Sequence, residues 1–279
     1  MAKKYLFSKP VKKLTMAEQM AETIKELILT GSLEPGDTLP TEPELCEQFG
    51  VSRAVVRDAT RILMALGLVD VKHGAGVFVT ESQSAAFGEA LLIALRRAGA
   101  SAWDVEEFEQ IMLPEVIALA ATAATDEEIA EMRQYVQDYR LVIKEFYQRR
   151  FEGQPILPSE EKAFIESSRR ISKAIFKASH NHVFQQLAEP LLKLRNLRLW
   201  QDDPEDTPES LTEMEMLFFN TLVDVIASRD PGLAREQAQR LMKLPPVAIE
   251  TMKQTPVGEQ PKIPISISQI IKELQENPS

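Results

Sequence analysis

Apolar residues recur along the chain at intervals that predict a short mixed head followed by a longer helical body. In the head, a spacing of three and four residues predicts helices over about 16–30, 42–49 and 53–66. Alternating apolar and polar residues then predict a β-hairpin over 68–79, with glycines in its turn. The head is therefore expected to contain helices and strands, whereas the body shows helical spacing alone.

Polar caps and a glycine set the predicted ends of the head helices. Thr41 is followed three residues later by Glu44, a spacing at which the two residues can form a capping box. Ser52 is a favourable N-cap for the third helix, and Gly50 ends the second. Because only a short turn separates these two helices, they predict a helix-turn-helix, with the hairpin as its wing. We therefore expect a winged helix-turn-helix domain over residues 16–80.

The body is divided into helices by Gly, Asp and Pro residues. A polar linker over 81–86 precedes an all-helical domain that we place at 87–253, and a Pro- and Gly-containing segment over 254–266 predicts a flexible tether. Residues 265–274 could form a short terminal helix, so that 254–279 is a tether with a helix at its end. The predicted fold class is mainly α. The expected body helices are 87–98, 103–124, 126–151, 159–179, 182–200, 209–228 and 231–243.

Charge and composition narrow the classes of function. The 279 residues carry a formal net charge of −10, but the first 80 hold 10 basic and 10 acidic side chains, including a basic arm over 1–15. A neutral head can still bind DNA, because phosphate contacts depend on local geometry. The single cysteine, Cys46, excludes an internal disulfide, and no apolar segment approaches the roughly 20 residues of a membrane span. We expect a soluble cytoplasmic protein without a membrane partner.

Three arginines lie four residues apart on the third predicted helix. Arg53, Arg57 and Arg61 form a cationic row that is separate from the apolar positions of this helix. The row could be a solvated helix face. Alternatively, it could contact phosphates and guanine edges, since a helix fits a major groove of about 12 Å.

Several spaced motifs of the head resemble the DNA-binding domain of GntR-family bacterial transcription regulators. The resemblance implies that the partner is double-stranded DNA, bound by a homodimer at a palindromic operator. Repression is the commoner outcome in this family. The motifs are Leu39-Pro40-Thr41-Glu42, Val51-Ser52-Arg53, Val56-Arg57, Gly67-Leu68-Val69 and Gly74-Ala75-Gly76-Val77-Phe78-Val79.

The same resemblance implies which residues contact DNA. Arg53 and Arg57 would contact bases or phosphates, Thr41 and Ser52 would hold phosphates at helix N-termini, and the wing would lie near the minor groove or the backbone. Pro43 stands where the family usually has Arg, so one DNA contact is expected to be missing. The complete set of expected contacts is Thr41, Glu42, Ser52, Arg53, Ala54, Val55, Arg57, Lys72, His73 and Gly74.

The body resembles, more loosely, the FadR-type effector domain of this family over about 90–243. The resemblance rests on Leu119-Ala120-Ala121, Ala178-Ser179-His180-Asn181 and Ala227-Ser228-Arg229-Asp230-Pro231. Many such domains hold a divalent metal through one Asp and three His. Ser168, Ser172, Phe219 and Leu241 stand at those positions, and none is a useful metal ligand. Glu109 or a neighbour also replaces an Arg of the first body helix. We therefore expect no metal and no cofactor.

Without a metal, two interpretations of the body remain open. A hydrophobic effector, such as a fatty acyl chain or its CoA thioester, could bind there, with Arg195 and Arg198 available for its phosphates. Alternatively, apolar side chains fill the cavity, no effector binds, and the body serves protein–protein interaction. An enzyme is not expected, because no cluster of nucleophile and base is recognisable. The expected effector-lining residues are Leu113, Ser168, Ser172, Phe219, Asn220 and Leu241.

Overall fold

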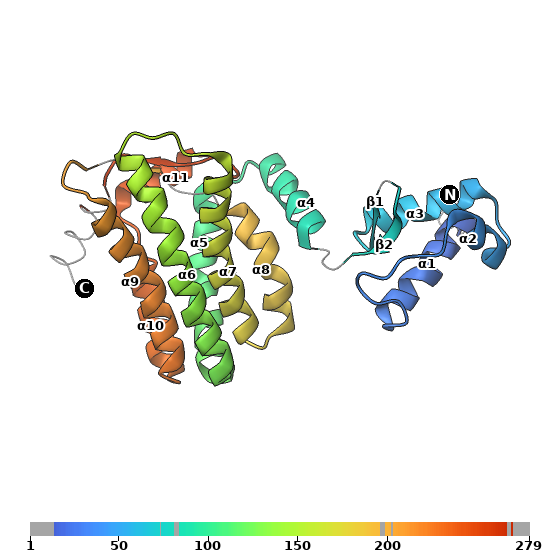
Figure 1. Ribbon diagram of the computed structural model, residues 1–279, viewed down its shortest axis with the longest axis horizontal. Helices are drawn as coiled ribbons and strands as arrows, with labels where there is room; N and C mark the ends of the chain where they lie inside the picture. Colours follow the sequence, from blue (N-terminus) through green and yellow to red (C-terminus); the bar gives the residue numbers. More distant parts are fainter. Residues whose placement is uncertain are drawn as a thin grey trace, which may run out of the picture. The chain divides into compact units, whose positions relative to one another are not determined.

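The computed structural model describes residues 14–72, 74–80, 84–195, 199–201, 203–266 and 269. The chain separates into two compact units, Met1–Phe87 and Gly88–Ser279, each with its own hydrophobic core. Figure 1 shows the head helices and hairpin in the first unit and a bundle of long helices in the second. The fold is mainly helical, as the sequence predicts.

The head is a winged helix-turn-helix. It consists of α1 (Met16–Leu29), α2 (Glu42–Phe49), α3 (Arg53–Ala65) and an antiparallel hairpin of β1 (Val69–Lys72) and β2 (Gly76–Val79). Buried side chains from all three helices and the hairpin form its core, and they include Ile24, Leu45, Leu63 and Val79.

The wing is held to the rest of the head by backbone hydrogen bonds. The Leu39 amide donates to the Val77 carbonyl at 2.8 Å, and the Val79 amide donates to the Asp37 carbonyl at 2.8 Å. The segment before α2 therefore extends along β2, and this pairing positions the hairpin beside the helices.

The body is a bundle in which α5 packs against α7, α9 and α10, while α6 packs against α7 and α9. Side chains such as Val116, Met132, Tyr139, Ile171 and Ile226 are buried between these helices. Among the described residues, no helix is long and apolar enough to cross a membrane. The body helices are α4 (Ser84–Arg97), α5 (Ala102–Ala123), α6 (Asp126–Phe151), α7 (Pro158–Ala178), α8 (His182–Leu194), α9 (Pro208–Ala227), α10 (Pro231–Leu241) and α11 (Pro246–Gln254).

The end of the eighth helix differs from its prediction. The helix predicted over 182–200 stops at Leu194, and the backbone of Arg195 is already extended. Residues 196–198 lie outside the described part of the chain. Beyond them β3 (Leu199–Trp200) pairs in parallel with β4 (Lys262–Ile263). The predicted helix does not continue through Leu199 and Trp200, because these residues pair with a strand more than sixty residues away in the sequence.

The predicted tether over 254–266 is also wrong. This segment is packed against the body, with Val257 and Ile263 only 1% and 2% exposed. Before it, α11 is not among the predicted helices, because Pro245 and Pro246 indicate a break after the helix over 231–243. Pro246 instead occupies the first turn of α11, where proline is tolerated because its missing N–H has no helical partner to lose. Of the predicted terminal helix, 267–274 apart from Gln269 lies outside the described residues.

Two corners of the bundle share one sequence pattern and one geometry. Ala-Ser-His-Asn over 178–181 joins α7 to α8, and Ala-Ser-Arg-Asp over 227–230 joins α9 to α10. In both, the third residue has a positive φ, 51° for His180 and 59° for Arg229. The fourth residue caps the following helix through its side-chain oxygen, which accepts two backbone amides. At each corner, the residue in the left-handed conformation lets the chain reverse direction within a few residues.

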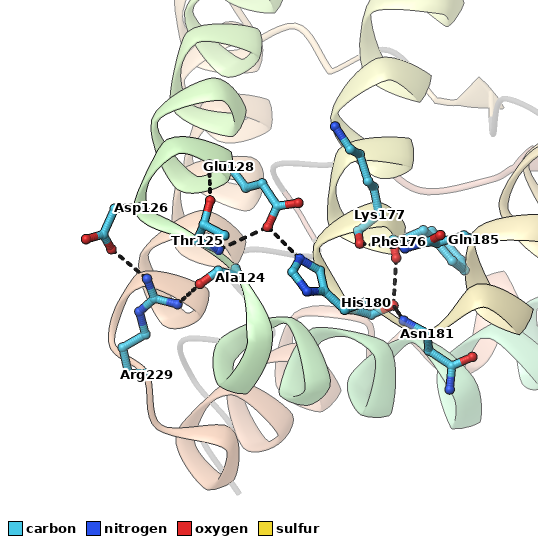
Figure 2. Close-up of polar contacts among 11 residues, drawn as sticks. Ala124, Thr125, Asp126, Glu128, Phe176, Lys177, His180, Asn181, Gln185 and Arg229 are labelled. Atoms are coloured by element: carbon cyan, nitrogen blue, oxygen red, sulfur yellow. Dashed lines mark hydrogen bonds and ion pairs between the residues drawn. The ribbon is translucent and has the colours of Figure 1, made fainter.

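Both corners also reach the start of α6 (Figure 2). His180 Nε2 lies 2.9 Å from Glu128 Oε2. Arg229 forms an ion pair with Asp126 at 2.6 Å and donates to the carbonyl of Ala124. Two basic side chains from separate helix pairs therefore hold the acidic first turn of α6.

Candidate nucleic-acid interface and body core

The two helices of the helix-turn-helix begin at hydrogen-bonded caps. The hydroxyl and the amide of Thr41 both donate to Glu44 Oε2 at 2.7 Å. These bonds, that of the hydroxyl first, lower the pKa of the Glu44 carboxyl. At α3, Ser52 Oγ accepts from the Val55 amide at 3.5 Å. Both donors of Thr41 already bind Glu44, so neither is free to donate to a phosphate as expected. The Ser52 hydroxyl accepts a bond at its cap and can still donate its own hydrogen.

The three arginines of α3 have different surroundings. Arg53, in the first turn, is exposed and forms no ion pair or hydrogen bond with any other described side chain. Arg57 Nε lies 3.0 Å from Glu42 Oε2, although 64% of the Arg57 side chain is exposed. Arg61 Nη1 lies 3.0 Å from Asp58 Oδ1, one turn away on the same helix. Of the three arginines of α3, Arg53 alone is neutralised by no side chain of the described head.

Glu42 holds Arg57 across the helix-turn-helix. Its side chain is 29% exposed, and its second oxygen, Oε1, is buried without a partner among the described atoms. The sequence predicted both residues as DNA contacts but not their pairing. They are fifteen residues apart on different helices, so no helical spacing indicates the contact. Glu42 is therefore placed to orient Arg57, whereas its own negative charge is unsuited to contact a phosphate.

The other expected contact residues lie at the start of α3 and in the wing. Ala54 is exposed and Val55 is half-buried. The Lys72 ammonium lies 4.9 Å from the centroid of the Phe78 ring, which places a cation on the hairpin. Gly74 is exposed, and His73 lies outside the described residues.

In the body, three expected effector-lining side chains belong to the main core. Phe219 is buried and meets Tyr139 edge to face, with ring centroids 5.2 Å apart. Leu113 and Leu241 are half-buried and pack against the same cluster. An apolar ligand would have to enter between these side chains.

The polar members of that set are on α7 and α9. Ser168 Oγ donates to the Ile165 carbonyl at 2.9 Å, and Ser172 Oγ donates to the Ser168 carbonyl at 3.4 Å. Asn220 is half-buried on α9. Within the described ranges, no group of three His, Cys, Asp or Glu side chains is placed to hold a metal ion.

The sequence does not predict an ion pair in the body between the buried Glu109 and the half-buried Arg195. Glu109 on α5 is 2% exposed, and its Oε2 accepts from Nε and Nη2 of Arg195 at 2.9 and 2.7 Å. Burial is the largest single effect and works to lower the pKa of Arg195. The charge and the hydrogen bonds of Glu109, together with the charge of Glu106, outweigh it, so the pKa is raised. Arg195 was expected to be available for ligand phosphates. It is held by Glu109 instead, and Arg198 lies outside the described residues.

A groove of about 470 Å³ lies between α6 and α7, away from the expected effector-lining residues. Charged side chains of both signs line it, and several are already paired: Arg170 lies over the Tyr135 ring at 3.7 Å and 3.5 Å from Asp138. The groove is therefore a charged surface feature and contains none of the six residues predicted for an effector.

Comparison with known proteins gives matches in both units. Residues 16–79 match the model of bacterial regulatory proteins of the gntR family, and residues 104–244 match the FCD domain. The galactonate operon transcriptional repressor of Escherichia coli (strain K12) is 27% identical over 244 residues, covering 82% of this chain and 94% of the relative. The Uxu operon transcriptional regulator of the same strain is 27% identical over 204 residues, covering 72% and 73%.

One solved structure matches over most of its length. Streptococcus agalactiae GntR superposes with a TM-score of 0.55 at 19% identity, covering 81% of this chain and 97% of that chain. This likeness is one of fold.

Proposed function

Since the chain belongs to the GntR family of bacterial regulatory proteins and carries an FCD domain, we propose that this DNA-binding transcription regulator is a cytoplasmic repressor. In this proposal it binds a palindromic operator as a homodimer and responds to a small molecule in its body. The name of the galactonate operon repressor, 27% identical to this chain, supports repression. We also propose that the body is an effector domain of the FadR type.

The observation that carries operator recognition is the position of Arg53. It lies in the first turn of α3, exposed, and no described side chain neutralises it. The N-terminal end of a recognition helix is the part that reaches base edges, and Arg is the commonest reader of guanine. Arg57, held by Glu42, is placed one turn further along the same helix.

The homodimer follows from the size of a single head. One recognition helix covers one half-site, and two half-sites about 34 Å apart are needed for specific binding. A twofold-symmetric protein then matches a palindrome.

Two classes of effector are proposed for the body. The core position of Leu113, Phe219 and Leu241 supports a hydrophobic effector such as a fatty acyl-CoA. The buried carboxylate of Glu109 and its half-buried partner Arg195 support a polar one, and the name of the galactonate operon repressor suggests sugar acids as a class to test. In the alternative proposal, the body binds no small molecule and contacts another protein.

A fluorescence-anisotropy titration tests DNA binding. The full chain is titrated onto DNA from upstream of its own gene and onto a scrambled fragment at several salt concentrations. We expect tighter binding to the native fragment and a linear fall of log K with log salt. Equal affinity for both fragments, and for fragments upstream of neighbouring genes, would contradict operator recognition.

Thermal shift separates the effector classes. Palmitoyl-CoA and galactonate are each added well above the expected dissociation constant. A ligand at about 100 times its Kd stabilises the folded chain by about 2.7 kcal/mol, which raises the melting temperature. A ligand that raises the melting temperature should also change the affinity for DNA in the anisotropy titration. If neither ligand does so, the protein-binding alternative is favoured.

A further inference from the structure

A segment that follows the residues matched by the FCD domain contacts the start of the body. The match ends at residue 244, and the segment over 255–258, which we name the strap, lies past it. The Ala102 amide donates to the Thr255 carbonyl at 2.7 Å, and the Val257 amide donates to the Ala100 carbonyl at 3.0 Å. The strap therefore runs along the turn between α4 and α5. Val257 is buried in the main core, which anchors the strap to the bundle.

The strap also holds the end of α4 through one side chain. Arg96 Nε donates to the Val257 carbonyl at 3.1 Å, and Arg96 Nη2 donates to the Gly258 carbonyl at 3.3 Å. Gly258 has a φ of +84°, and a Cβ atom there would overlap the Arg96 guanidinium and lie 3.0 Å from Leu92 Cδ1. The backbone conformation therefore favours glycine at this position, and a Cβ atom there would displace the Arg96 guanidinium from the strap.

Few other contacts hold α4 in place. Over its described side chains, 87–97, no side chain larger than that of Gly88 is fully buried. Leu91, Leu92 and Leu95 are half-buried and form its apolar contact with the main core. Near its start, Gly88 lies against Pro190 and Lys193 of α8. A helix of 14 residues is marginally stable by itself, so its orientation depends on these attachments.

We infer that the strap holds α4 in one orientation on the body, with Arg96 as the positioning residue, and thereby sets the affinity of the protein for its operator. α4 is the first body helix after the winged head in the chain, so its orientation determines where the linker leaves the body. The part of this inference that concerns operator affinity rests on the proposed function. The part that concerns α4 does not.

Hydrogen–deuterium exchange on the full chain tests the hold on α4 without DNA. We expect Arg96→Ala and Gly258→Ala to speed exchange of the amides over 88–97 by about tenfold, the effect of losing one or two hydrogen bonds. Arg97→Ala is the control for the first change, because it removes a neighbouring exposed arginine on the same helix. Gly153→Ala is the control for the second, since Gly153 has a φ of +67° but open space around it. Both controls should leave exchange in α4 within about twofold of the wild type.

The same four variants are then compared in the anisotropy titration. We expect Arg96→Ala and Gly258→Ala to change operator affinity by about fivefold or more relative to their controls. Unchanged α4 exchange in both variants would overturn the inference. Faster exchange with the same operator affinity as the controls would overturn the link to DNA binding. If the wild-type chain binds no operator, the proposed function fails, and the exchange comparison alone decides whether the strap holds α4.

Discussion

At the residue scale, Arg53 and Arg57 have different surroundings although the sequence places them on one helix face. Arg53 is free among the described side chains, whereas Arg57 is held by Glu42 at 3.0 Å. A free guanidinium at the N-terminal end of α3 can turn toward base edges, while a held one keeps a single direction. We therefore assign base reading to Arg53 and a fixed contact, of phosphate or base, to Arg57.

Arg53→Ala is expected to weaken binding to the cognate operator by about 1–3 kcal/mol and to relax the preference for the base at that position. The measurement is an anisotropy titration on the cognate fragment and on fragments with single base changes. Arg61→Ala is a matched control, because Arg61 is already paired with Asp58 on its own helix. An equal loss on cognate and scrambled DNA would show that Arg53 contacts only phosphate.

The pairing of Glu42 with Arg57 predicts that their contributions to DNA binding are not additive. Glu42→Ala removes the group that orients Arg57, and Arg57→Ala removes the contact itself, so the double variant should lose little more than Arg57→Ala alone. A double-mutant cycle on the cognate operator measures this, and we expect a coupling of about 0.5–3 kcal/mol. Additive losses would mean that each residue contacts DNA independently.

At the element scale, local caps determine where most body helices begin. The hydroxyl and amide of Ser101 both donate to Asp104 Oδ2 at 2.6 Å at the start of α5. These bonds, the hydroxyl first, lower the pKa of Asp104 below its usual 3.8. The same type of cap begins α1, α2 and α6. Each cap is made within four residues, which explains why these helix starts could be predicted.

Asp104→Asn is expected to destabilise the body by about 1 kcal/mol at neutral pH, because the N-cap box at α5 loses its charge. A carboxyl whose pKa is lowered in the folded chain contributes stability above its unfolded pKa, about 3.9. That contribution is lost as the pH falls through the lower folded pKa. Denaturant unfolding of wild type and variant between pH 7 and 2 should therefore show a difference that shrinks in acid. Ser101→Thr keeps the cap and should show no such difference.

At the scale of the whole molecule, the head and the body have separate cores. Leu63 is fully buried in the head, and Ile171 is fully buried in the body. Because no buried side chain is shared between the two clusters, each unit is expected to unfold in its own transition.

Leu63→Ala should destabilise the head by about 2–5 kcal/mol and leave the body transition unchanged. Ile171→Ala should destabilise the body by a similar amount and leave the head transition unchanged. Differential scanning calorimetry of the full chain at one concentration measures both transitions. A single transition that shifts with either substitution would show that the two units unfold cooperatively.

The sequence by itself determined the features that depend on neighbouring residues. These are the three helices and the hairpin of the head, the capped starts of the body helices, the arginine row, and the mainly helical fold class. Spacing, caps and turn residues act within a few positions of the chain, so they can be read without knowing which segments meet.

Only the tertiary structure decided which distant residues pair. Glu109 meets Arg195 over 86 residues, and Arg96 meets the strap over 161. No local sequence pattern indicates either contact, because the two partners meet only when the helices pack together. For the same reason the segment over 254–266 is predicted to be a tether. Its few apolar residues have no local periodicity, and a hydrogen bond to the start of α5, burial of Val257 and pairing with β3 order the backbone there.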